Sequence, residues 1–484
     1  MIGITAYGAY VPRLRLIRSA VAQANAWYAP GLVGKGKGTR SMANWDEDSI
    51  TMAVAAARDC LGKEDDRSHI NGVFLASTTL PFADRLNSGL MAASLTLQEN
   101  VDAVDMTGSP RAAMSALSQA LTKAQMGGNI LVAAADKRKT RAASTQELDF
   151  GDGAASLIVG SEAVLAEYLS SAVITDDFVD HFRATDRDVD YNWEERWIRD
   201  EGVSKIVPKA VAAALTKAKV NAEDVDHFIF PTVFKKLDLK IAQQCGVNAD
   251  AVVDNLAAEV GDTGSAHALL MLSKTLENAK SGDIILISQF GQGAETLVFK
   301  VTDEITSFKP QRGFSGWLSR GVEESNYTRF LAYNDQIELE KGMRGEQDKK
   351  TALSTLYRHK DMITGFIAGR CKETGLVFFP PTRISYDTEN PLQDTQVPYK
   401  LADLTASIAS WSADYLSFSM SPPNQYGMVD FDGGGRLLME FTDVAEGDVE
   451  NDKKMEMVFR IKDFDRQRGF KRYFWKATPV KASL

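Results

Sequence analysis

Cysteine, basic charge and long apolar runs are scarce in this chain of 484 residues. Its three cysteines, Cys60, Cys245 and Cys371, lie far apart and form no motif, which argues against a disulfide framework. The formal net charge of -10 argues against nucleic acid or an anionic membrane as the main partner, because polyanions do not attract an acidic protein. No apolar run approaches the roughly 20 residues that span a bilayer, and the N-terminus lacks the features of a signal peptide. We therefore expect a soluble, cytoplasmic protein.

A repeated segment is the most informative feature that the chain does contain. The run 105–111 recurs in altered form as 261–267, and both copies include Thr-Gly-Ser. Apolar residues follow each copy at helical spacing, and a glycine and a buried strand come next. Ser109 and Ser265 are expected to cap the two helices, and Pro110 suits a first helical position. The chain therefore contains a duplicated α/β unit.

The order of expected elements is the same around both copies. A helix and a strand precede each repeat, Asp46 or Asp48 is available to cap the first of these helices, and a glycine-rich turn with an apolar strand closes each half. Alternating strands and helices predict mostly parallel sheets covered on both faces, with the halves at 1–165 and 166–305. The expected elements are 2–10, 49–61, 72–77, 130–135 and 150–159 in the first half, and 206–218, 227–230, 284–288 and 291–299 in the second.

The composition changes after residue 305. Residues 306–363 are polar and charged at first and are interpreted as a linker and a helix. From 364 to 484 short alternating runs separated by glycine turns predict an all-β domain, for which a small barrel is the natural closed form. The turn at 432–435 is interpreted as a hairpin, because no helix follows it to make a phosphate site.

Several motifs carry a resemblance to a known family. Segments 7–12, 46–53, 131–136 and 150–155 resemble the thiolase superfamily, in the branch of 3-hydroxy-3-methylglutaryl-CoA synthase and ketoacyl synthase III. Segment 369–380 resembles the OB-fold acyl-CoA-associated domain that accompanies thiolase-like proteins. The resemblance implies an α/β fold class, with a duplicated thiolase-like layered domain followed by a small all-β OB-fold domain. It also implies a coenzyme A thioester as substrate and a homodimer, with further enzymes of acyl-CoA metabolism as possible partners.

The OB-fold relatives often carry a zinc ribbon of four cysteines. The four equivalent places in this chain are interpreted as Cys371, Thr374, Ser385 and Thr388. One thiolate cannot satisfy a tetrahedral structural zinc, so we expect a degenerate ribbon without metal.

The chain departs from the superfamily at its catalytic positions. The acyl-accepting cysteine at a helix start, where the dipole favours a thiolate, falls here at Ser109 or Pro110. The histidine that follows a second-half strand falls in the run 230–233, where proline or threonine stands in its place. The asparagine becomes Asp262, and the acid/base glutamate falls near 78–79, where both residues are threonine. Claisen condensation through an acyl-cysteine is therefore not expected.

The remaining side chains suggest other chemistry. If the halves pair as in the superfamily, Ser109, Arg111, Asp262 and His267 meet at one pocket. Asp262 and His267 can then act as an acid/base pair in aldol or retro-aldol chemistry on a β-hydroxyacyl-CoA. Asp262 as a helix cap and His267 as an interior histidine are the alternatives. Ser109 is either a helix cap or the nucleophile of an acyltransferase, and a non-catalytic acyl-CoA-binding scaffold is a third function.

The coenzyme A moiety has candidate cationic partners. Arg111 and the basic run of Lys137, Arg138 and Arg141 can meet its phosphates, although such charges also occur on solvated surfaces. The segment 176–202, rich in acids and aromatics, is interpreted as a lid that shapes substrate choice, with a dimer contact as the alternative. Asp152, in a Gly-Asp-Gly turn, is expected to be structural.

Overall fold

The chain folds into two compact units. A computed structural model describes residues 1–63, 65–343, 345, 349–350, 352–386, 389, 391–445 and 447–480. Among these residues no helix is both long and apolar enough to cross a membrane. The first unit comprises Met1–Ala43, Asp48–Gly89 and Gln98–Asn334, and the second comprises Asn44–Glu47, Leu90–Leu97 and Asp335–Leu484.

One nine-stranded sheet organises the first unit. Its order is β11-β12-β13-β8-β1-β7-β6-β4-β5, and the two halves of the chain join where β1 pairs with β8 through Gly3 and Ile4. The repeat predicted from the sequence is therefore confirmed as two sets of strands in one sheet. The strands are β1 (Gly3–Tyr10), β4 (Ile70–Ala76), β5 (Asp102–Met106), β6 (Asn129–Asp136), β7 (Gly153–Gly160), β8 (Ala166–Thr175), β11 (His227–Ile229), β12 (Ile284–Phe290) and β13 (Gly293–Val301).

The prediction of mostly parallel strands is wrong. Only the pairs β4·β5, β4·β6 and β11·β12 are parallel, whereas the five other neighbouring pairs run antiparallel. The physical reason lies in the two glycine-rich turns, at 151–153 and 291–293. The second turn returns the chain as β13 beside β12, the strand it has just left. The first turn precedes β7, which runs back beside β6 after a loop that contains the short helix α5 (Gln146–Asp149).

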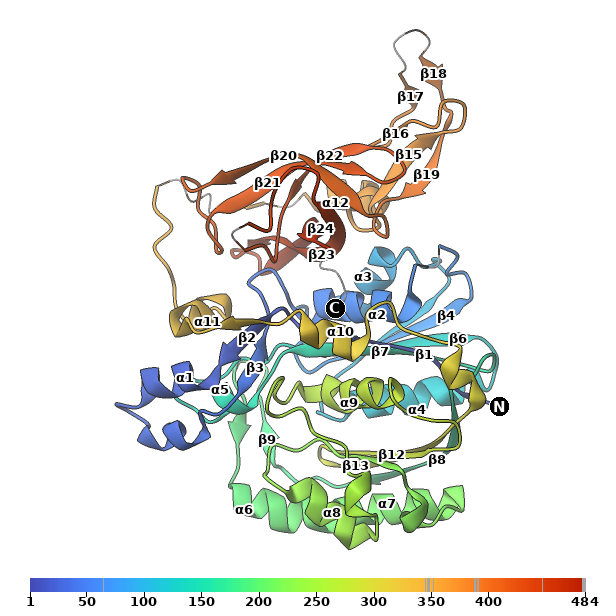
Figure 1. Ribbon diagram of the computed structural model, residues 1–484, viewed down its shortest axis with the longest axis vertical. Coiled ribbons are helices and arrows are strands. Elements are labelled where there is room, and N and C mark those ends of the chain that lie inside the picture. The colour runs from blue at the N-terminus through green and yellow to red at the C-terminus, as the bar shows by residue number, and fades with distance from the viewer. Residues whose placement is uncertain are drawn as a thin grey trace. The chain divides into compact units, whose positions relative to one another are not determined.

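Helices cover the sheet in layers. Figure 1 shows α4 and α9 between the strands of the two halves, α2 on the outer side of the first half, and α7 and α8 on the outer side of the second. Two buried apolar clusters fill the layers, one around α4 and α9 and the other around α7 and α8. The bounds are α1 (Arg18–Asn25), α2 (Ser49–Leu61), α3 (Asn87–Ser94), α4 (Ala112–Ala124), α5 (Gln146–Asp149), α6 (Glu195–Trp197), α7 (Ser204–Ala218), α8 (Leu237–Cys245), α9 (His267–Leu276), α10 (Gly313–Ser319) and α11 (Tyr327–Tyr333).

Short elements complete the first unit. A three-stranded sheet has the order β14-β2-β3, and β9 pairs with β10 in a two-stranded sheet. These strands are β2 (Leu14–Ile17), β3 (Thr39–Met42), β9 (His181–Phe182), β10 (Tyr191–Asn192) and β14 (Val322–Glu324). The short helical turns, of 3-10 type except for the π-helix η2, are η1 (Pro30–Lys35), η2 (Ile198–Val203), η3 (Ala222–Asp224), η4 (Ala249–Ala251), η5 (Gly264–Ala266) and η6 (Asp303–Thr306).

The cap of α2 shows how local sequence sets an element. The Asp48 carboxylate accepts hydrogen bonds from the backbone amides of Ile50 and Thr51. In turn, the Asp48 backbone amide donates to the Thr51 hydroxyl. This reciprocal capping box satisfies amides that the helix itself leaves free. Of the two predicted caps, Asp48 is therefore the right one.

The two repeated helix starts differ from the prediction. Helix α4 begins at Ala112 rather than at Pro110, and the Ser109 hydroxyl accepts only the Arg111 amide just before it. The predicted cap at Ser265 is wrong as well. Carboxylates take over its role, since Asp136 accepts the Ser265 amide and Asp262 accepts the Gly264 amide. A stronger, charged acceptor from the tertiary fold has displaced the local hydroxyl.

From residue 364 onward the second unit is all-β, as the sequence predicts, and two short helices precede these strands. Its five-stranded sheet has the order β22-β21-β20-β23-β24, and a bridge between Phe441 and Ala477 links the chain after β22 to β24 at the opposite edge. The turn at 432–435 is the predicted hairpin. The elements are α12 (Leu353–Arg358), α13 (Lys360–Ile363), β15 (Ile367–Cys371), β16 (Val377–Phe378), β17 (Ile384–Ser385), β18 (Leu392–Gln393), β19 (Gln396–Lys400), β20 (Ala406–Asp414), β21 (Asn424–Phe431), β22 (Arg436–Glu440), β23 (Lys454–Asp465) and β24 (Phe470–Pro479).

Hydrogen bonds link two of the expected ribbon positions, Cys371 and Ser385, through Thr395. The Cys371 sulfur lies 3.2 Å from the Thr395 hydroxyl, which in turn donates to Ser385. Hydrogen bonds with Thr374 and Thr395 lower the pKa of the Cys371 thiol to about 6. Thr388, the fourth predicted place, lies outside the described residues. In the described part of the chain, no group of three or more histidine, cysteine, aspartate or glutamate side chains is placed to hold a metal ion.

A buried charge cluster lies inside the second unit. Arg460, only 1% exposed, pairs with Glu47 at 2.5 Å and with Asp443 at 2.7 Å. Lys476 pairs with the fully buried Asp46 at 2.9 Å. Buried charges require such partners because burial removes their hydration. The cluster therefore fixes the segment 44–47 against strands β23 and β24.

Replacing the buried arginine tests this cluster. Arg460→Met leaves the Glu47 carboxylate without its partner, so we expect a loss of about 3–5 kcal/mol in the free energy of unfolding. Arg436→Met is the matched control, because Arg436 pairs with Asp430 on the surface and such pairs contribute about 1 kcal/mol or less. Denaturant unfolding of the full chain measures both. Equal effects of the two substitutions would contradict the assignment.

Candidate functional site

The two halves of the first unit lock together through reciprocal contacts. In one direction the backbone of Asp262, at the second repeat, bonds the first glycine turn: its amide donates to Asp149 and its carbonyl accepts from Gly151, both at 2.8 Å. In the other direction the first repeat bonds the second turn, because Ser109 and Arg111 both donate to the Gly291 carbonyl at 3.0 Å. These contacts join each repeat to the glycine turn of the other half, and the predicted meeting of the four candidate residues at one pocket stays a prediction.

Asp262 forms an ion pair across the junction. Its carboxylate lies 2.9 Å from the Arg138 guanidinium, which stacks 3.6 Å over the Phe150 ring. Burial favours the neutral acid, but the charge and the hydrogen bond of Arg138 outweigh it and lower the pKa of Asp262 below its usual value. The side chain remains 24% exposed. Asp262 is therefore an ionised and partly accessible carboxylate.

His267 is close to Asp262 but fully engaged. Its Nδ1 accepts the Thr263 amide at 3.1 Å, and its Nε2 lies 2.9 Å from the Asn255 carbonyl, to which a neutral ring donates. Burial lowers the pKa of His267, so the ring is neutral at physiological pH. The residue is 2% exposed. In this arrangement both ring nitrogens serve the fold, and the proton-transfer role assigned to His267 from the sequence stays a prediction.

Asp136 is a hub that the sequence interpretation missed. Its carboxylate accepts the hydroxyls of Ser77, Thr78 and Thr79 as well as the amides of Thr78 and Ser265. These bonds tie the ends of β4 and β6 to the start of η5 in the other half. The signal in the sequence was an aspartate placed directly after a fully buried strand, where carboxyl ends of strands converge.

Two buried polar atoms beside this hub have no hydrogen-bond partner among the described residues. They are the Ser265 hydroxyl and the side-chain carbonyl oxygen of Gln289. The side-chain amide of Gln289 donates to the Gly264 carbonyl at 3.4 Å. Buried polar atoms are normally satisfied. This spot therefore suits a polar ligand atom or a water molecule.

The contacts of Ser109 do not activate it as a nucleophile. Its hydroxyl donates to the Gly291 carbonyl, and no described carboxylate or imidazole is bonded to it. Arg111 is held nearby by Glu295 at 3.1 Å, and Ser115 donates to the same carboxylate. A serine hydroxyl needs a base to become a nucleophile. Its nucleophilic role, and the coenzyme-binding role of Arg111, stay predictions.

The basic run predicted to meet phosphate is split up by the fold. Arg138 is buried against Asp262, Lys139 pairs with Asp188 at 3.1 Å, and the Lys137 amine reaches the Tyr333 carbonyl at 3.3 Å. Arg141 is exposed. Phosphate binding by this run stays a prediction.

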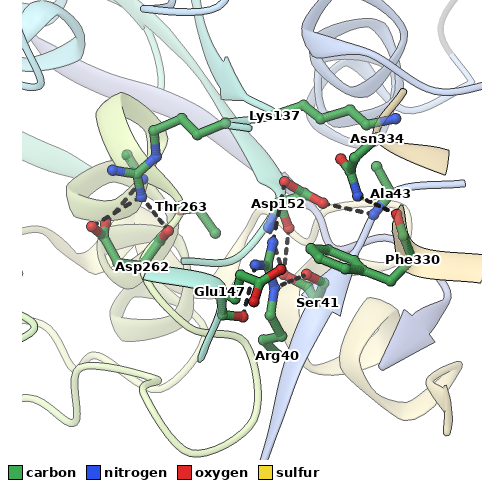
Figure 2. A network of polar contacts seen from close by, with 12 residues as sticks. Arg40, Ser41, Ala43, Lys137, Glu147, Asp152, Asp262, Thr263, Phe330 and Asn334 are labelled. Atoms are coloured by element: carbon green, nitrogen blue, oxygen red, sulfur yellow. Dashed lines mark hydrogen bonds and ion pairs between the residues drawn. The ribbon is translucent and has the colours of Figure 1, made fainter. Parts of the chain in front are cut away.

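A second buried network supports the first glycine turn. Figure 2 shows Arg40, Ser41 and Asp152 at its centre, with Asp262 and Thr263 to one side. Arg40 lies 3.8 Å from Asp152 and 5.1 Å over the Phe330 ring, and Asp152 accepts the Ala43 amide at 2.8 Å. Each partner is fully enclosed by protein. The structural role predicted for Asp152 fits these contacts.

Comparisons with known proteins agree with this architecture. Residues 215–299 match the model of the C-terminal part of 3-oxoacyl-(acyl-carrier-protein) synthase III, and residues 399–460 match the model of the ChsH2 C-terminal OB-fold domain. Hydroxymethylglutaryl-CoA synthase of Aeropyrum pernix is 29% identical over 66% of this chain and 91% of its own length. The synthase of Methanosarcina mazei is 27% identical over 70% of this chain and 99% of its own.

Solved structures give the same fold. A hydroxymethylglutaryl-CoA synthase complexed with CoA has a TM-score of 0.59 at 20% identity and covers 72% of this chain and 94% of its own. Synthase III of Pseudomonas aeruginosa has a TM-score of 0.56 at 19% identity and covers 62% and 98%. The chain is a thiolase-like domain followed by an OB-fold. The resemblance and fold class expected from the sequence are confirmed.

The segment 176–202 of the thiolase-like domain lies against the junction of the halves. Arg183 donates to the Thr78 carbonyl, Asp180 accepts the Gln292 side chain at 2.7 Å, and Val189 bridges to Lys139. Three elements of the candidate site thus hold this segment. Its interpretations as a lid and as a dimer contact both stay predictions.

The other replaced positions of the thiolase-like domain have structural partners. The Thr232 hydroxyl accepts the Phe234 amide, and the Thr232 carbonyl accepts the Asn255 amide group at 3.2 Å. Thr78 and Thr79 both bond Asp136. These residues hold loops in place around Asp136 and Asp262 and show no acid or base of their own.

The close fit of the first glycine turn gives a test of the junction. A Cβ on Gly151 would lie 2.0 Å from the Val260 carbonyl, so we expect Gly151→Ala to lower the free energy of unfolding by about 1–3 kcal/mol. Gly34→Ala is the matched control, because nothing lies within 4 Å of its Cβ and it should stay within about 1 kcal/mol of the parent. Thermal and denaturant unfolding measure both variants, and a neutral Gly151→Ala would show that the turns do not fit as tightly as described.

Proposed function

We propose that this protein is an acyl-CoA enzyme that makes or breaks a carbon–carbon bond by aldol or retro-aldol chemistry on a β-hydroxyacyl-CoA. The synthases to which the chain is similar carry CoA in their names, and one is complexed with CoA. The substrate class is taken from these relatives. Cleavage without a covalent acyl-enzyme is the part that this chain's own residues support.

The observation that carries the proposal is the Asp262–Arg138 pair at the junction of the halves. A carboxylate kept ionised by a neighbouring guanidinium, and still partly exposed, can accept a proton from a ligand hydroxyl. Serine replaces cysteine at the acyl-accepting position, and Ser109 has no base. An acyl-enzyme route therefore lacks an activated nucleophile, and the aldol route does not need one.

The proposed cleavage of the β-hydroxyacyl-CoA begins at its β-hydroxyl. Asp262 removes the proton of the β-hydroxyl, the oxygen forms a carbonyl, and the bond between Cα and Cβ breaks. Its electron pair moves into the thioester as an enolate, which is then protonated at Cα to give the shortened acyl-CoA. The Arg138 charge and the N-terminal end of α4 favour the negative charge that develops.

A non-catalytic acyl-CoA-binding scaffold is the second candidate. One observation favours it: both nitrogens of His267 are occupied within the fold, so an expected member of the acid/base pair is unavailable in this conformation. Such a protein would bind acyl-CoA and bring partner enzymes together. We also propose a homodimer formed through the thiolase-like domain, by likeness to its relatives.

Replacing Asp262 tests the proposed chemistry. Incubation with a panel of β-hydroxyacyl-CoA thioesters should release an aldehyde or ketone, and Asp262→Asn should lower kcat by about 10²–10⁴-fold because the amide cannot accept the proton. Product release is followed by chromatography and mass spectrometry, with thermal unfolding as the check on folding.

Two further variants separate the alternatives. Ser109→Ala should keep most of the activity, whereas loss of activity together with a trapped acyl-serine would establish the acyltransferase. His267→Ala would remove the ring that bonds the Thr263 amide and the Asn255 carbonyl, so we expect it to lower the free energy of unfolding. The activity of this variant is therefore compared with its measured free energy of unfolding. Tight binding of acyl-CoA without any turnover by the parent protein would establish the scaffold.

A further inference from the structure

A second histidine–aspartate pair lies in the segment that covers the junction. His181 Nδ1 is 3.0 Å from the Asp180 carboxylate. The other oxygen of Asp180 accepts the Gln292 side chain at 2.7 Å. Gln292 directly follows Gly291, whose carbonyl binds Ser109 and Arg111. The pair is therefore fixed from the second half of the thiolase-like domain, next to the first repeat.

The segment around His181 is also fastened to the first half. Arg183 pairs with Asp190 at 2.6 Å and donates to the carbonyl of Thr78, whose side chain and amide bond Asp136. Strand β9, which begins at His181, pairs with β10. The imidazole thus sits on a short hairpin that both halves hold in place beside the Asp136 hub.

The two histidines at the junction differ in what their nitrogens do. Both ring nitrogens of His267 are bonded within the fold. In His181 the Asp180 carboxylate orients Nδ1, while Nε2 has no hydrogen bond to any described residue, and the side chain is 23% exposed. An aspartate that fixes one ring nitrogen and leaves the other free is the arrangement by which imidazoles transfer protons.

The charges around His181 set its protonation. Burial opposes the imidazolium, and Arg138 opposes it further, but the hydrogen bond and charge of Asp180 and the charge of Asp190 outweigh both and raise the pKa of His181 above its usual 6.5. The other charged groups of the hairpin are paired: Arg183 with Asp190, Arg187 with Asp186, and Asp188 with Lys139. The raised pKa favours the protonated ring more than in a free imidazole, which suits a proton donor.

We propose that His181, oriented by Asp180, is the residue that exchanges a proton with Cα of the acyl-CoA bound at this junction. The inference rests on the proposed function and adds its second proton transfer. In the cleavage direction the Nε2 proton goes to Cα as the enolate electron pair forms the new C–H bond. In the condensation direction neutral Nε2 takes a Cα proton, and its own electron pair forms the N–H bond. Asp180 is a positioning residue that acts through His181.

Three variants test this role. We expect His181→Gln to lower kcat by about 10²–10⁴-fold with KM changed little, because the amide can keep a bond to Asp180 but cannot transfer a proton. Asp180→Asn should lower kcat and move the midpoint of the kcat pH profile to lower pH, since the carboxylate no longer favours the imidazolium. His359→Gln, at an exposed histidine of the second unit, is the matched control and should leave both values unchanged.

A second readout separates this inference from the proposed function. Incubation of acetyl-CoA with the protein in D2O should place deuterium on Cα, and mass spectrometry follows this exchange without any carbon–carbon cleavage. Exchange that disappears in His181→Gln supports the role of His181 even if no β-hydroxyacyl-CoA is cleaved, in which case only the aldol proposal fails. Cleavage and exchange that both survive in His181→Gln overturn the role while the aldol proposal stands. A parent protein that neither exchanges nor cleaves overturns both.

Discussion

The reciprocal contact between repeat starts and glycine turns is the constraint on which the thiolase-like domain depends. Each half presents one glycine turn to the other half's repeat, through Gly151 in one direction and Gly291 in the other. The backbones approach so closely that a Cβ at Gly151 would overlap a carbonyl oxygen. Because both halves contribute to each contact, neither half can complete the junction alone. The same contacts bring residues more than a hundred positions apart into one small region.

Charged side chains from both halves gather where the repeat starts and the glycine turns meet. Carboxylates have replaced the hydroxyls that the local sequence offered as caps, since Asp136 and Asp262 accept the amides at the start of η5. Arg138 then balances Asp262, and the segment 180–190 adds Asp180 and Asp190 with their basic partners His181 and Arg183. The junction therefore holds several charged side chains, of which Asp262 and His181 are partly exposed.

Polar contacts also stabilise the second unit. The Cys371 thiol and the Ser385 hydroxyl are linked through the Thr395 hydroxyl. Inside the same unit the buried Arg460 pairs with Glu47 and Asp443. These hydrogen bonds and ion pairs join segments that lie far apart in the sequence.

Local patterns in the sequence determined the helices and strands. Helix α2 spans 49–61 as its apolar periodicity predicts, and the repeated segment revealed the duplication. Both could be read from the sequence because apolar spacing and terminal glycines reflect backbone geometry over a few residues. The departures from the superfamily's catalytic set were also visible in the sequence alone. Tertiary structure decided strand direction, the carboxylate caps and which histidine has a free nitrogen. Both ring nitrogens of His267 are engaged, whereas His181 is oriented by Asp180, which bonds Gln292, 112 positions further along the chain. Such long-range contacts exist only once the halves meet, so no local spacing records them.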